Sequence, residues 1–150
     1  MNTRFSPPRD KADLLKILID DGSPFNELRD ILFFAAVIGW REGRRVPLAG
    51  KGEAIRWDTM NNRLGTEEVM DMIAVAANAD DRELLAAERH DERVETLEEF
   101  ANGGLEVIRE RISAAGAVPL RQVFIRMVQD YLTNGETTGD IELTKRILQL

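Results

Sequence analysis

The segment from residue 25 to residue 40, FNELRDILFFAAVIGW, is the strongest constraint on the fold because it is apolar on both faces of the helix that its 3.6-residue period predicts. One face and then the other are filled by hydrophobic side chains: Leu28, Ile31, Leu32, Ala35 and Ile38, then Phe33, Phe34, Ala36 and Val37. A helix that is apolar all round is a buried one. We therefore expect this helix at the centre of the fold, ended by Gly39 and Gly43.

The rest of the chain is also predicted to be helical. Asp10 is in position to cap a first helix and Ser23 to cap the central helix, and Thr66 begins a third helix with two glutamates in its first turn. The charged stretch 81–113 has a helical pattern that Asn102-Gly103-Gly104 is expected to interrupt as a C-cap. A clean apolar stripe over 120–132 predicts a fifth helix that packs on the core, and 141–150 a short terminal one.

Alternation of β-branched residues is nearly missing, so at most a short strand or turn is expected, at residues 54–57. The chain is thus predicted to be all-α, a single-domain bundle of five to six helices with a long basic connection after the second helix. Residues 1–9, with Pro7 and Pro8, are expected to be a flexible arm, and residues 10–150 the single helical domain.

Composition excludes several classes of protein. There is no cysteine, hence no disulfide framework, thiolate metal site or cysteine nucleophile. The longest apolar run, 31–38, is far shorter than the roughly 20 residues that span a bilayer. Residues 1–9 have no apolar core of the kind that a secretory signal needs. We therefore expect a soluble, cytoplasmic protein without membrane contact.

The basic connection, GWREGRRVPLAGKGEAIRW at residues 39–57, stands out because the whole chain has a net charge of −7. Glycines let a backbone approach a phosphate closely, and arginine guanidinium groups match phosphate or carboxylate. The predicted binding residues are five cations and two flanking aromatic side chains: Arg41, Arg44, Arg45, Lys51, Arg56, Trp40 and Trp57. They would contact nucleic acid or an acidic protein surface. In the alternative interpretation the tryptophans anchor the connection to the core and the arginines pair with the chain's own acids.

Catalytic and cofactor motifs are not found. Gly50-Lys51 lacks the hydroxyl residue that follows the glycine-lysine pair of a phosphate-binding loop, and Arg45 stands where that loop needs a glycine. His90 is the only histidine and is expected to be solvated on a charged helix, without a second zinc ligand at helical spacing. No nucleophile elbow is present. We expect no metal, no cofactor and no enzymatic activity.

Two segments carry a resemblance to a known family: FFAAVIGWREGRRVPLAGKGEAIRW and LEEFANGGLEVI. Over about residues 28–108 the chain resembles DNA phosphorothioation-associated protein 4, a family of small accessory proteins in bacterial islands that modify DNA with sulphur and restrict unmodified incoming DNA. The matching positions are Arg44, Arg45, Gly50, Glu53, Ile55, Arg56 and Trp57.

The resemblance implies an accessory role in antiphage defence without an established enzymatic activity. We expect an adaptor that docks, through residues 41–57, on a larger defence protein or on DNA held by one. The alternative is a DNA-binding regulator of the same system. The acidic chain would then need a homodimer to gather enough phosphate contacts, and its affinity would fall steeply with salt.

Overall fold

The computed structural model describes residues 3–20 and 22–133, and the helix predicted for 141–150 lies outside them. Six α-helices and one two-stranded sheet make up the regular structure of this part of the chain. In chain order the elements are β1 (Arg4–Phe5), α1 (Ala12–Leu18), α2 (Leu28–Arg41), β2 (Ile55–Arg56), α3 (Trp57–Met60), α4 (Thr66–Ala77), α5 (His90–Ala115) and α6 (Leu120–Thr133). The predicted all-α, single-domain class is confirmed.

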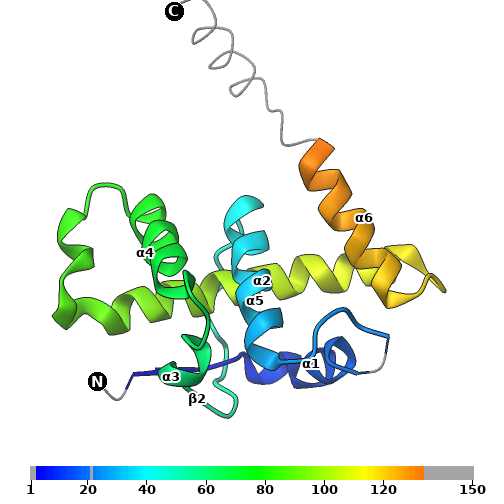
Figure 1. The fold of residues 1–150 in the computed structure, drawn as a ribbon, viewed down its shortest axis with the longest axis horizontal. Coiled ribbons are helices and arrows are strands. Elements are labelled where there is room, and N and C mark those ends of the chain that lie inside the picture. The colour runs from blue at the N-terminus through cyan, green and yellow to red at the C-terminus, as the bar shows by residue number, and fades with distance from the viewer. Residues whose placement is uncertain (1–2, 21, 134–150) are drawn as a thin grey trace, which may run out of the picture.

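Helix α5 is the long axis of the molecule, and α2 crosses it near its middle (Figure 1). Helix α4 packs against α5 on one side of this crossing, and α6 follows from the other end of α5. The hydrophobic side chains form one core, in which Ile31, Leu32 and Ala35 of α2 are completely buried. The predicted central position of this helix is therefore confirmed.

The crossing of α2 and α5 is close because glycines lie where the two backbones meet. A Cβ atom on Gly39 would lie 2.0 Å from the carbonyl oxygen of Phe100, and one on Gly104 only 1.7 Å from that of Ala35. The sequence predicted that Gly39 ends α2 and that the Asn-Gly-Gly segment breaks α5, and both predictions are wrong. These glycines have helical backbones inside continuous helices, while Gly43, with φ of 67°, follows the end of α2 as expected.

The N-terminal segment is part of the fold, which differs from the flexible arm expected for residues 1–9. Arg4 and Phe5 pair antiparallel with β2, in the register Arg4 to Arg56 and Phe5 to Ile55. Phe5 is completely buried, and the backbone N–H of Ser6 donates to the buried carboxylate of Glu98 in α5. Burial of a large aromatic side chain explains why this segment is ordered.

Helix boundaries follow local capping chemistry only in part. Asp10 lies in a 3₁₀ turn at 9–11 that leads into α1, and α4 begins at Thr66 as predicted. Ser23 does not cap α2, which begins at Leu28. Its hydroxyl instead accepts from the N–H of Phe25 at 3.1 Å and donates to the carbonyl of Leu18.

Two further expectations concern the helices around the core. The predicted stripe of α6 is confirmed as core at Val123, Phe124 and Met127, whereas Val128 and Leu132 of the same stripe are exposed. Helix α5 begins only at His90, after 3₁₀ turns at 82–85 and 87–89. Within residues 3–20 and 22–133, no helix combines the length and the apolar character that crossing a bilayer requires.

Candidate docking surface

The first half of the basic connection is fastened along the middle of α5. The N–H of Val46 donates to the carbonyl of Glu99 at 3.1 Å, and Asn102 Nδ2 donates to the carbonyls of Val46 and Pro47 at 3.2 and 3.3 Å. A Cβ on Gly103 would lie 2.0 Å from the carbonyl oxygen of Arg44. The Asn-Gly-Gly segment, predicted to be a helix end, is therefore the seat of the connection.

Arg44 and Arg45 are neutralised by carboxylates of α5. Arg44 Nη1 and Nη2 donate to the two oxygens of Glu110 at 2.7 and 2.9 Å, and these hydrogen bonds raise the pKa of Arg44 and lower that of Glu110. Arg45 Nη2 lies 3.3 Å from Glu99 Oε1 and 3.4 Å from the hydroxyl of Thr96. For these two arginines the geometry is that of the alternative interpretation, in which the chain's own acids are the partners.

Arg41 and the two flanking tryptophans differ in their exposure to solvent. The guanidinium of Arg41 lies over the ring of Tyr131 at 5.4 Å. Trp57 is only 9% exposed and packs edge-on against the ring of His90 at 5.2 Å, whereas Trp40 is 44% exposed at the end of α2. Trp57 is therefore a core anchor, and of the two tryptophans only Trp40 is presented to solvent.

His90 differs from the solvated histidine that we expected. It is 2% exposed, with Nδ1 at 3.2 Å from the hydroxyl of Thr3 and Nε2 at 3.0 Å from Glu67 Oε1. Together with Trp57 it fixes the start of the N-terminal segment against α4 and α5. No group of three metal-ligating side chains is found in the part of the chain that the structure describes.

The second half of the connection pairs with the N-terminal segment. The N–H of Gly52 donates to the carbonyl of Pro7 at 2.7 Å, and that of Arg9 donates to the carbonyl of Gly50 at 3.0 Å. This pairing brings Lys51 and Arg56 of the connection together with Arg4 and Arg9. The sequence does not predict these two arginines as part of the site, because they lie in the segment expected to be a flexible arm. The one available signal was Phe5, a large apolar residue that an arm would leave exposed.

We call these four exposed cations, Arg4, Arg9, Lys51 and Arg56, the basic strip. Arg56 lies 3.2 Å from Asp58, an exposed pair of little energetic weight. The side chains of Arg4, Arg9 and Lys51 form no hydrogen bond or ion pair with any other described residue. Arg4 and Arg56 stand directly opposite each other across the β1–β2 ladder, where like charges repel. An anion bound between them would relieve this repulsion.

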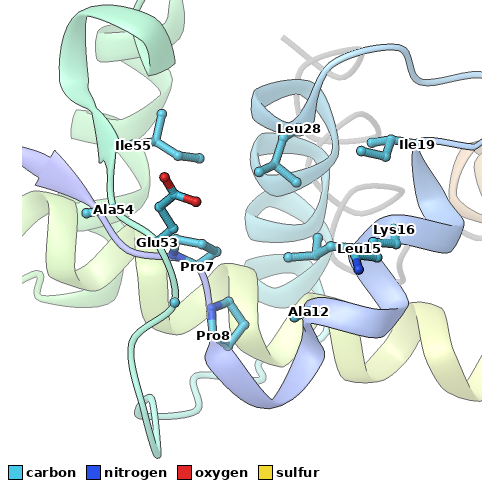
Figure 2. A pocket seen from close by; sticks show the side chains of 11 residues that line it. Pro7, Pro8, Ala12, Leu15, Lys16, Ile19, Leu28, Glu53, Ala54 and Ile55 are labelled. Carbon is cyan, nitrogen blue, oxygen red and sulfur yellow. The ribbon is translucent and has the colours of Figure 1, made fainter.

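A cleft lies beside the basic strip, between α1 and residues 52–55 (Figure 2). Its volume is about 410 Å³, and its walls are mainly apolar, with Pro7, Pro8, Leu15, Leu28 and Ile55 among the lining residues. Two charged side chains reach it, Glu53 from the connection and Lys16 from α1. The connection therefore forms one wall of a cleft as well as half of the basic strip.

Comparison with protein families decides the relationship. Residues 4–146 match the model of the family described as DNA sulphur modification system-associated protein 4. The chain belongs to this family. No curated protein and no solved structure gave a significant match. The match to the family begins at Arg4 and so includes all four residues of the basic strip.

Proposed function

We propose that the protein is a non-enzymatic adaptor of a DNA sulphur modification system, which acts in antiphage defence by docking on an acidic surface of a larger protein of that system. The observation that carries this proposal is the basic strip. In a chain with a net charge of −7, Arg4 and Arg9 form no ion pair with any carboxylate of the described residues, and Lys51 has only a longer-range attraction to the buried carboxylate of Glu98. Membership of a family associated with the system supports the choice of partner.

An acidic protein surface is favoured over DNA by the charge of the whole chain. The affinity for DNA depends on how many phosphates the cations of the protein neutralise, and the acidic remainder of the chain repels these phosphates. Four cations on one short ladder suit an acidic patch of a folded partner. The facing pair Arg4 and Arg56 also matches a phosphate, so a DNA-binding regulator is the second candidate.

The test is affinity for the other proteins of the system, measured with purified full-length chain by calorimetry or pull-down. Charge reversal in the double variant R4E/K51E is expected to weaken binding at least tenfold while the helical circular dichroism stays unchanged. The matched control is R109E, since Arg109 is an exposed arginine of α5 that also has no partner among the described residues. Undiminished binding by R4E/K51E would remove the strip from the mechanism.

DNA binding is tested on the same variants by a gel shift at low salt. A shift that depends on the basic strip and declines steeply as salt rises, with no binding to proteins of the system, would establish the regulator instead. The absence of catalysis is tested by incubating the purified chain with modified and unmodified DNA and divalent cations. Any turnover that survives further purification would refute the non-enzymatic proposal.

A further inference from the structure

We propose that the cleft in Figure 2 binds a segment of the partner protein that carries an apolar side chain next to a lysine or arginine. This inference rests on the proposed adaptor function and adds to it a second contact of opposite charge. The basic strip would hold acidic residues of the partner, and the cleft would hold a neighbouring apolar and basic pair.

The size and lining of the cleft favour an apolar anchor. A volume of about 410 Å³ lies in the range of roughly 300–1,000 Å³ that binding pockets occupy, and it exceeds what a single leucine or phenylalanine side chain fills. The rings of Pro7 and Pro8 form one wall and Leu15 and Leu28 the other (Figure 2). Burying an aliphatic or aromatic side chain there removes apolar surface from water on both partners.

The negative charge of Glu53 favours a basic residue in the partner segment. Its carboxylate projects from the wall of residues 52–55 into the cleft (Figure 2) and forms no hydrogen bond or ion pair with any described residue. Lys16 lies on the α1 side of the cleft and is not paired with it. A carboxylate at the edge of an apolar cavity selects a cation, and a lysine or arginine can cover apolar wall with its stem while its charged end reaches the acid.

Position along the chain links the cleft to the basic strip. Glu53 follows Lys51 by two residues, so the charge of the side chains changes from positive to negative within three residues of the connection. A partner segment lying across residues 51–55 would therefore place an acidic residue at the strip and a basic one at the cleft. This order of charges makes the surface selective, because a reversed segment would bring like charges together.

The walls are held in place before any partner arrives. Gly52 donates its N–H to Pro7, and a Cβ on Gly52 would lie 3.1 Å from the carbonyl oxygen of Pro7. Leu15, on the opposite wall, is 6% exposed and belongs to the core. A preformed cleft loses little conformational entropy on binding.

The experiment measures binding of the full-length chain to the system's proteins and to synthetic peptides that tile their sequences. The variant A12F introduces a large side chain that fills the cleft from an exposed position of α1. The control is A114F, which introduces the same side chain at an exposed position of α5 away from the cleft. We expect A12F and E53K each to weaken binding at least tenfold and A114F to have no effect. Reversing the charge of the partner's basic residue should restore binding to E53K.

Each outcome separates the two proposals. If R4E/K51E weakens binding but A12F and E53K do not, the cleft is not a docking site and the adaptor function stands. If the cleft variants weaken binding and R4E/K51E does not, the strip proposal fails. If no protein or peptide of the system binds, both are wrong. Binding of small apolar cations alone, with no effect of E53K on partner affinity, would identify the cleft as a small-molecule site and overturn the inference.

Discussion

Gly104 is the position where one methyl group should most damage the fold. In the variant G104A the new Cβ would lie 1.7 Å from the backbone oxygen of Ala35, whereas real Cβ atoms essentially never come within 3.0 Å of such a neighbour. The obstacle is backbone, so α2 and α5 would have to separate by more than an ångström along their central contact. Overpacking a core costs about 1–3 kcal/mol and occasionally more. Alanine recovers about 1 kcal/mol of helix propensity.

We therefore expect G104A to lower the free energy of unfolding by about 2 kcal/mol, measured by urea denaturation followed by circular dichroism. In a chain of this size that corresponds to a fall in Tm of roughly 4–8 °C. The control is G50A, whose Cβ would meet Arg9 at an ordinary 3.6 Å and should leave stability nearly unchanged. Wild-type stability of G104A would refute the close crossing of α2 and α5 at this glycine.

Three further predictions concern the N-terminal segment, an ion pair and the single tyrosine. Phe5→Ala should lower the free energy of unfolding, measured by urea denaturation, by about 3–5 kcal/mol. If residues 1–9 were a flexible arm, the substitution would leave this free energy unchanged. Arg44→Glu should lower Tm, because the new carboxylate would face that of Glu110, and the exchange R44E/E110R should recover most of the loss. An unchanged Tm in Arg44→Glu would show that the pair is unimportant for stability. Burial and the hydrogen bond to Glu42 raise the pKa of Tyr131 from 10.0 to about 12. The stability that depends on the protonated phenol should therefore be present below pH 10 and be lost as the pH rises toward 12. A phenolate absorbance midpoint near 10 in the folded protein would contradict this.

Periodicity predicted the elements whose signal is local. The apolar stripe of α6, the start of α4 at Thr66 and the central place of α2 depend on residues within a few turns of one another. Glycine could not be interpreted in the same way, because a glycine that ends a helix and one that admits a neighbouring backbone look alike in sequence. Only the partner helix, α2 against α5, distinguishes Gly104 from a C-cap.

For the candidate site, too, only the local features could be predicted from the sequence. The sequence indicated a basic connection, and the structure presents Lys51 and Arg56 at its surface. The ion pair between Arg44 and Glu110 joins positions 66 residues apart, so no local pattern reveals it. Arg4 and Arg9 join the site only because Phe5 anchors their segment, a tertiary effect that the proline-rich composition of residues 1–9 concealed.

The N-terminal strand has a consequence for synthesis of the chain. Ser6 contacts Glu98 and Lys11 contacts Asn102, across separations of 92 and 91 residues. During translation residues 4–11 therefore leave the ribosome well before their α5 partners. Closing such long loops is slow, so Phe5 remains uncovered at least until α5 has emerged and is available to chaperones or to neighbouring nascent chains.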